Sequence, residues 1–238
     1  RRGVGYRHRL HGDDARGGLR RGLDATDDLV VDEAPERFGE GRGGRGWVSP
    51  AGGLYLSWLR SDLDTETVAL LPMLAAAAAQ AALAEIGIAG VAIKWPNDLL
   101  VGGRKLAGIV VFARHGETAW AAVGLGVNIA AAPSLDGTPG LPATAVADHL
   151  ELGDPELTRD RIACSFVNRL SAAVVEPERA LAAWRELLLQ RPGDRLKVRL
   201  ASGDEVSGVV VGIEDRGFLR LRCDDAERVI TGGDIIES

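Results

Sequence analysis

Two consecutive glycines, Gly102 and Gly103, separate two apolar runs at residues 99–101 and 105–112. Adjacent glycines reach the positive φ angles of a two-residue β-hairpin turn, so this stretch predicts a strand, a tight turn and a second strand. Another strand is predicted at residues 120–129. The middle of the chain is therefore constrained to form a sheet.

Helical segments flank this sheet region. Residues 65–86 are helix formers that follow a capping Thr65, and residues 156–189 predict two helices broken near Pro177. Further strands are predicted at residues 29–31, 54–59 and 91–94, which surround the first helix. The longest apolar run, 70–79, is too short for a membrane span and predicts a buried helix.

The pattern changes at Arg191-Pro192-Gly193, which marks a boundary. Beyond it, apolar residues recur with period two at 196–200, 206–211 and 218–221, which is typical of a small β-barrel. We expect two domains, 1–190 and 191–238. The predicted fold class is α/β (α+β), with a mixed sheet and helices on one side followed by the small barrel.

Composition excludes several classes. The formal net charge of −6 gives no whole-chain case for nucleic-acid binding. Cys164 and Cys223 are too far apart for a metal motif or a disulfide framework, which fits a reducing cytoplasm. The Arg-rich N-terminus lacks the apolar core of a signal peptide.

Residues 39–47 form a loop rich in glycine and arginine. Glycine allows backbone N–H groups to approach an anion closely, and the guanidinium groups of Arg42 and Arg45 suit phosphate or carboxylate. We expect the loop to be mobile without ligand and ordered with it. A solvated surface loop and an RNA-binding segment are the alternatives.

A second motif runs from Lys94 to Ile109 and includes the predicted hairpin. Lys105, at the start of the second strand, is a cation on a rigid element that could offset charge on a phosphoryl oxygen. Asp98 could hold a metal ion or orient an incoming amine. Taken alone, these residues could equally belong to an ordinary charged hairpin.

Residues 94–109 resemble the signature of the biotin protein ligases. The loop with Trp47, the segment Gly124–Ile129 and Pro142-Ala143-Thr144 resemble further motifs of that family in the same order, and the C-terminal strands resemble its SH3-like domain. The resemblance implies a class II synthetase-like catalytic fold that uses ATP and Mg²⁺ to convert biotin into biotinyl-5′-AMP. It also implies transfer of biotin to a lysine in the acceptor domain of a carboxylase, and leaves a homodimer open.

The resemblance also suggests a role for individual residues. Lys105 would bridge the biotin carboxylate and the α-phosphate, Arg42 would hold the phosphate, and Asp98 would face the acceptor lysine. The remaining residues that match ATP- or substrate-binding positions are Glu36, Gly39, Gly41, Arg45, Trp47, Lys94, Asn97, Gly108 and Asn128. No metal ligands are identified beyond the candidate Asp98.

The chain departs from the family in its N-terminal part. Residues 10–16 replace the usual Ser-Thr-Asn motif that recognises the ureido ring, Glu36 and Arg37 replace Gln and Thr, and Glu40 replaces a basic residue. Unpaired ureido groups are costly to bury, so we expect weak biotin affinity. His8 and His11 are either substitutes or solvated surface residues.

Three alternative functions stay open. The chain could be a relative that handles lipoate or octanoate, although the complete motif at residues 94–98 argues against this. It could be a biotinyl-AMP-binding protein with little or no transfer activity. It could also be a ligase that doubles as a repressor, which needs a helix-turn-helix domain that these residues do not contain.

Overall fold

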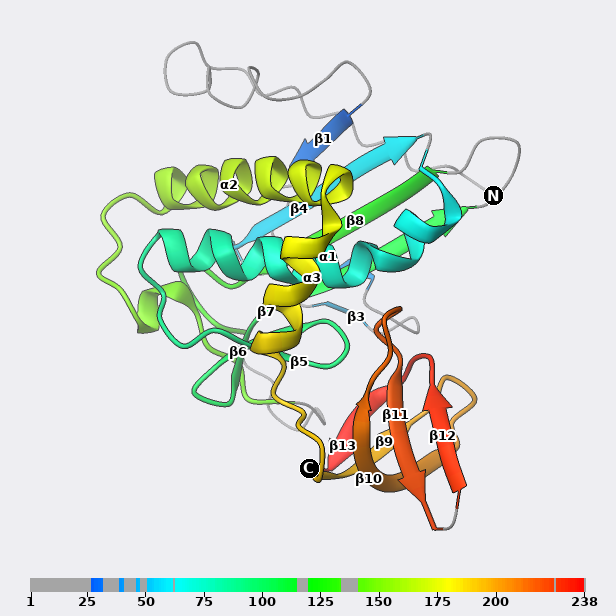
Figure 1. Ribbon diagram of the computed structural model, residues 1–238. Helices are drawn as coiled ribbons and strands as arrows, with labels where there is room; N and C mark the ends of the chain where they lie inside the picture. The colour runs from blue at the N-terminus through cyan, green and yellow to red at the C-terminus, as the bar shows by residue number, and fades with distance from the viewer. Residues whose placement is uncertain are drawn as a thin grey trace.

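The computed structural model describes residues 27–31, 39–40, 46–47, 51–61, 63–114, 120–133, 141–224 and 226–237, and before residue 51 only strand pairing is described. Six strands form one sheet in the order β1-β4-β8-β7-β6-β5 (Figure 1). In that order their bounds are Asp27–Val31, Leu54–Ser61, Trp120–Val127, Arg104–Arg114, Asp98–Val101 and Ala92–Lys94. Strands β2 (Gly39–Glu40) and β3 (Gly46–Trp47) pair separately.

The expected combination of a sheet with helices on one side is confirmed. The strands of the large sheet pair antiparallel to one another. Parallel pairing, which we expected within a mixed sheet, is confined in the described residues to two isolated bridges, Ile93 with Leu188 and Lys105 with Ala143.

Three helices, α1 (Thr65–Glu85), α2 (Pro155–Val175) and α3 (Pro177–Leu187), lie over one face of the sheet (Figure 1). The break expected near Pro177 separates α2 from α3. The Asp64 carboxylate caps α1 by accepting from the Thr67 amide at 2.7 Å. Proline begins both α2 and α3, where its missing N–H costs no helical hydrogen bond.

Helix α1 is long and apolar enough to cross a membrane by length and composition alone. Residues 75–79 are nevertheless buried alanines, and the helix packs against α2, α3 and the sheet. Small side chains let these neighbours approach closely. Helix α1 is therefore the core helix of this fold, as expected for residues 70–79.

A second antiparallel sheet follows, with the order β12-β11-β10-β9-β13. Its strands, from β9 to β13, are Arg195–Arg199, Glu205–Ile213, Leu219–Cys223, Ala226–Ile230 and Asp234–Glu237. The first three match the predicted period-two runs, whereas β12 and β13 were not expected. Buried residues of both sheets belong to one continuous apolar cluster.

Candidate active site

One row of paired residues crosses four strands of the large sheet. Asp98 of β6 pairs with Gly108 of β7, Gly108 pairs with Gly126 of β8, and Gly126 pairs with Tyr55 of β4. Directly paired residues lie on the same face of a sheet. Since neighbouring strands lie about 4.8 Å apart, the two glycines leave a strip about 10 Å wide without side chains. A carboxylate and a phenol border this strip.

The next row extends the strip along β8. Here Val110, Gly124 and Ser57 are paired across three strands. A Cβ atom on Gly124 would lie 2.8 Å from the Val110 Cγ1, so a side chain there would force its neighbour to move. We call Gly108, Gly124 and Gly126 the glycine floor. Gly108 and Gly126 have no side chain to separate their backbone from a ligand, whereas the Val110 side chain lies over Gly124.

Lys105 reaches this face because the ladder between β6 and β7 is irregular. Lys105 lies three residues before Gly108. At that spacing, a regular strand would point the Lys105 side chain to the face opposite that of Gly108. The register shifts between Leu99 and Leu100, so that Leu100 pairs with Lys105. As a result, the Lys105 Nζ lies 2.6 Å from the Asp98 Oδ1, at the edge of the glycine floor.

The Lys105–Asp98 ion pair is partly open to solvent. The exposed fractions of the two side chains are 28% and 23%. Such a pair contributes little to stability, about 0–1 kcal/mol. Its consequence is chemical, because it holds a cation and a carboxylate together beside a surface that can accommodate a ligand.

The backbone of Lys105 is held on both sides. The Lys105 amide donates to the Pro142 carbonyl at 2.7 Å, and the Thr144 amide donates to the Lys105 carbonyl at 2.9 Å. Residues 142–144 therefore act as a short extra strand beside the start of β7. Thr144 is buried and is itself fixed by hydrogen bonds from its hydroxyl to Asp148 and with His149.

Asn128 connects these segments and leaves one acceptor unused. Its Nδ2 donates to the carbonyls of Thr144, at 3.0 Å, and Lys105, at 3.4 Å. Its Oδ1 is buried and has no hydrogen-bond partner among the residues that the structure describes. Exchanging the two amide atoms would set an oxygen against both carbonyls, so the orientation is fixed. An orphaned buried acceptor beside Lys105 is a feature that a bound donor could satisfy.

Two other residues of the signature make structural contacts. The Asn97 side chain donates to the Ile109 carbonyl, and the Ile109 amide donates to the Asn97 carbonyl at 3.0 Å. These bonds clamp the turn before Asp98 onto β7. The Lys94 Nζ donates to the Ile235 carbonyl of the C-terminal sheet at 2.9 Å.

Tyr55 was not identified from the sequence. Its side chain is half-buried, and burial raises the pKa of its phenol to about 12. A Cβ atom on Gly53 would lie 2.3 Å from the Tyr55 hydroxyl oxygen, so glycine is needed beside the phenol. The strand order, which puts β4 next to β8, places Tyr55 and Asp98 at opposite ends of one row of paired residues, while the Tyr55 phenol extends along β4 over Gly53.

Several predicted residues cannot be placed. Glu36, Gly41, Arg42, Arg45 and the segment 10–16 lie outside the described residues, and Gly39 and Trp47 are described only as paired backbone. The expected ordering of the loop at 39–46 on ligand binding therefore stays a prediction.

No group of three or more His, Cys, Asp or Glu residues suited to a metal ion occurs in the part of the chain that the structure describes.

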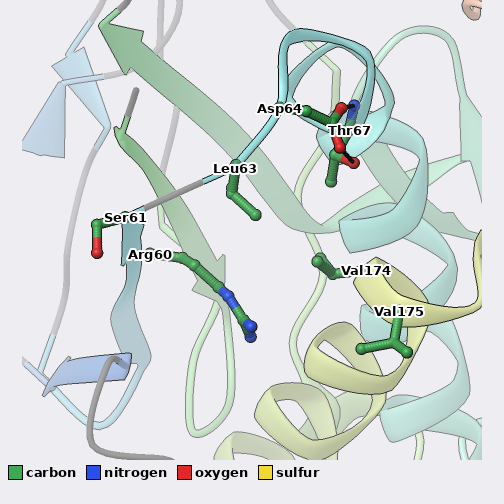
Figure 2. Close-up of a pocket in the computed structure, with 7 residues that line it drawn as sticks. All are labelled: Arg60, Ser61, Leu63, Asp64, Thr67, Val174 and Val175. Carbon is green, nitrogen blue, oxygen red and sulfur yellow. Dashed lines mark hydrogen bonds between the residues drawn. The ribbon is translucent and has the colours of Figure 1, made fainter. Parts of the chain in front are cut away.

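A separate pocket of about 290 Å³ lies where β4 ends, α1 begins and α2 ends (Figure 2). It is lined by Arg60, Ser61, Leu63, Asp64, Thr67, Val174 and Val175. None of these residues belongs to the glycine floor or to the Lys105–Asp98 pair. The pocket is therefore not part of the candidate active site.

Two family models match the chain. Residues 26–128 match the biotin/lipoate A/B protein ligase family, and residues 193–236 match the biotin protein ligase C-terminal domain. A biotin–[acetyl-CoA-carboxylase] ligase of Mycobacterium tuberculosis is 30% identical over 88% of this chain and 79% of the relative. A ligase of the same name from Paracoccus denitrificans is 35% identical over 85% of this chain and 88% of its own.

Solved structures show the same fold. A biotin protein ligase from Aquifex aeolicus, in complex with biotin and ATP, has a TM-score of 0.65 at 22% identity and covers 87% of both chains. The Leishmania major enzyme in complex with biotinyl-5-AMP has a TM-score of 0.56 at 22% identity, over 91% of this chain and 90% of that one. The shared fold agrees with the two family models and with the relatives that are 30% and 35% identical, and these matches show that the chain belongs to the biotin protein ligases.

Proposed function

We propose that this chain uses ATP to form biotinyl-5′-AMP and then transfers biotin to a lysine of an acceptor domain. The observation that carries the proposal is the Lys105–Asp98 pair, with 2.6 Å between its charged atoms, at the edge of the glycine floor. The pair combines a cation for phosphate chemistry with a carboxylate that can receive an amine. The relatives that bear the name biotin ligase support the choice of substrate.

In the first step, a biotin carboxylate oxygen attacks the α-phosphorus of ATP, and the bond to pyrophosphate breaks. Negative charge then grows on the α-phosphate oxygens. The Lys105 backbone is hydrogen-bonded on both sides and its ammonium is held at the edge of the glycine floor by Asp98, so it is positioned to stabilise this charge. We assign Arg42 and Arg45 to the phosphates as well, on the basis of their loop position.

In the second step, a lysine amine of the acceptor attacks the acyl carbon of biotinyl-AMP, and AMP leaves. The incoming amine arrives mostly as an ammonium ion, which a carboxylate attracts, and it releases a proton to solvent before its nitrogen attacks. The Asp98 carboxylate lies next to Lys105 and is partly exposed, so a side chain from outside can reach it. We assign Asp98 to the orientation of this amine.

The remaining assignments depend on the same reaction. Mg²⁺ would be held mainly by ATP phosphates, with the Asp98 carboxylate as a hard oxygen donor nearby, and would neutralise phosphate charge. The acceptor would be the biotin domain of a carboxylase, while a homodimer is left open. We propose domains at 1–190 and 191–238. A cytoplasmic setting agrees with the free thiols of Cys164 and Cys223.

The test is mass spectrometry of a biotin acceptor domain incubated with the protein, ATP, Mg²⁺ and biotin. The proposal predicts one added biotinyl group on the acceptor lysine, dependent on ATP. Parallel reactions with lipoate and octanoate should give no adduct. An acceptor that gains lipoyl or octanoyl mass, or no mass at all, would refute the proposed substrate or the transfer step.

A further inference from the structure

The signature motif makes direct contact with the C-terminal sheet. The Trp95 side chain is buried, and its Nε1 donates to the Gly217 carbonyl at 2.8 Å. Its neighbour Lys94 donates to the Ile235 carbonyl at 2.9 Å. The Trp95 amide also donates to the Gln190 side chain, which lies at the proposed domain boundary, at 2.7 Å. Two bonds from consecutive residues therefore join the signature motif to the C-terminal sheet, and a third bond holds Trp95 to the residue just before that sheet.

The turn that receives Trp95 fits tightly between two other elements. Gly217 has a φ of +79°, and a Cβ atom there would lie 2.7 Å from the Met73 Sδ of α1. Two residues earlier, Asp215 accepts from Arg185 of α3 at 2.9 Å. The β10–β11 turn is therefore held by α1, α3 and the signature motif together.

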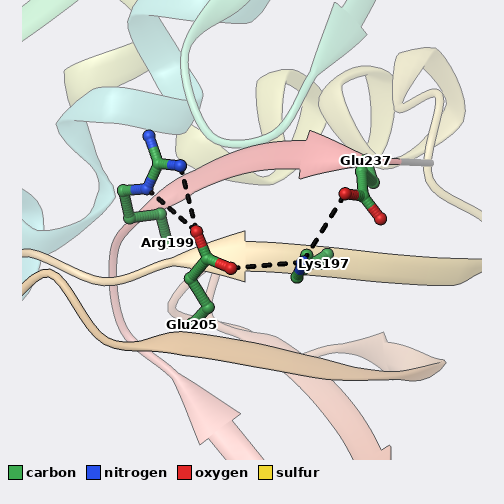
Figure 3. A network of polar contacts seen from close by, with 4 residues as sticks. All are labelled: Lys197, Arg199, Glu205 and Glu237. Carbon is green, nitrogen blue, oxygen red and sulfur yellow. Dashed lines mark hydrogen bonds and ion pairs between the residues drawn. The ribbon is translucent and has the colours of Figure 1, made fainter.

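The strand that receives Lys94 is held within its own sheet. Figure 3 shows Lys197 of β9 between Glu205 of β10, at 3.2 Å, and Glu237 of β13, at 3.5 Å. Strand β13 also pairs with β9 through Ile235 and Val198. The Ile235 carbonyl that accepts from Lys94 is thus part of an anchored strand and not of a loose chain end.

The same residues lie next to the chemical groups of the active site. Lys94 is paired with Asp98 in the β5–β6 ladder, and Asp98 forms the ion pair with Lys105. The turn between Lys94 and Asp98 is clamped to β7 through Asn97. A displacement of Lys94 and Trp95 would therefore be transmitted over very few residues to Asp98.

We propose that Lys94 and Trp95 are positioning residues that couple the C-terminal sheet to the Asp98–Lys105 pair. This inference rests on the proposed function and gives Lys94 a role different from direct substrate binding. In this arrangement the C-terminal sheet is a rigid support whose docking sets the position of the reacting groups. Loosening the support from either side should lower the catalytic rate.

Four variants test the coupling, after transfer by the wild-type protein has established the proposed function. Lys94→Met removes the bond to Ile235 from the catalytic side, and Lys94→Arg keeps a donor. Gly217→Ala disturbs the turn from the C-terminal side through its strained φ and Met73. Arg220→Met is the matched control, since it removes an ion pair with Glu227 at the β12 edge of the same sheet.

The readouts are kcat and the KM for ATP, from pyrophosphate release, and hydrogen exchange at residues 214–218 and 233–237. We expect Lys94→Met and Gly217→Ala to lower kcat about tenfold, to change KM less than about threefold, and to speed exchange in the segment they touch. Lys94→Arg should recover most of kcat, and Arg220→Met should leave it unchanged.

Two results would overturn the coupling. If Lys94→Met raises the KM for ATP while kcat and exchange stay unchanged, Lys94 binds the nucleotide directly. If Lys94→Met and Gly217→Ala both speed exchange while kcat stays at the wild-type value, the contact only docks the sheet.

Discussion

The ultraviolet absorbance of the Tyr55 phenol can serve as a probe beside the glycine floor, because the chain contains only two tyrosines. Burial raises the pKa of Tyr55 to about 12, so its tyrosinate absorbance should develop well above pH 10. We expect Tyr55→Phe to remove this late component from an ultraviolet pH titration, whereas Tyr6→Phe should retain it. A late component that survives Tyr55→Phe would contradict the burial of this phenol.

The same pKa predicts how stability changes at high pH. Between pH 10 and 12 the unfolded state loses the phenolic proton while the folded state retains it. The free energy of unfolding should therefore fall as pH rises through this window. Tyr55→Phe should lose less stability over the same range, as measured by urea unfolding at pH 8 and pH 11. An identical pH dependence for both proteins would argue against a raised pKa.

Replacing Lys105 and replacing Asn128 should lower the free energy of unfolding by different amounts. The Lys105 side chain forms a partly exposed ion pair, so Lys105→Ala should change the free energy of unfolding by less than about 1 kcal/mol. Asn128 is buried and bonds two carbonyls, so Asn128→Ala should cost about 1–3 kcal/mol. Urea unfolding measures both. A larger loss for Lys105→Ala would make Lys105 a structural residue.

Strand β8 contains two glycines, Gly124 and Gly126, although glycine weakens a strand. Gly126→Val should abolish binding of biotin and ATP in calorimetry without lowering the unfolding temperature, because valine favours strands. Ala122→Val, on the same face and strand but two rows away, is the control. Equal binding by both variants would exclude the glycine floor as the ligand surface.

The sequence predicted the strands and helices that have strong local signals. The Gly102-Gly103 turn, the helix over residues 65–85 and the break near Pro177 are confirmed. The expected cap at Thr65 is wrong, because Thr65 is the first helical residue and the carboxylate of Asp64 before it accepts from the Thr67 amide. Strand β12 (Ala226–Ile230) was missed because four of its five residues are exposed, which leaves no alternation of buried and exposed positions. Strand β13 was missed because only Ile235 is buried.

The candidate site was predictable only in part. Lys105 and Asp98 could be singled out from their motif, whereas their contact depends on the register shift at Leu99, which no local pattern marks. Tyr55 required the strand order β4-β8-β7-β6, which long-range pairing determines. Lys94 could also be singled out from the motif, but the motif did not indicate that its side chain contacts the C-terminal sheet. The assignment of Lys94 to substrate binding stays a prediction.

At the scale of the whole molecule, both family models fall within one continuous structure. Core residues of the large sheet, the helices and the C-terminal sheet form a single apolar cluster. The two sheets on either side of the proposed boundary at 191 therefore share a core. The weak biotin affinity expected from residues 10–16 and Glu36 stays a prediction, because these residues lie outside the described part of the chain.

The central claim is that the Lys105 cation, fixed beside the glycine floor, drives formation of biotinyl-5′-AMP. The direct test is the rate of biotin-dependent pyrophosphate release from ATP without an acceptor, in the wild-type protein, Lys105→Ala and the control Arg220→Met, which removes a surface ion pair far from Lys94. Loss of one preorganised charge-stabilising contact typically slows such a step about 10²–10³-fold. We predict that loss for Lys105→Ala and a wild-type rate for Arg220→Met, whereas a wild-type rate in Lys105→Ala would contradict the account.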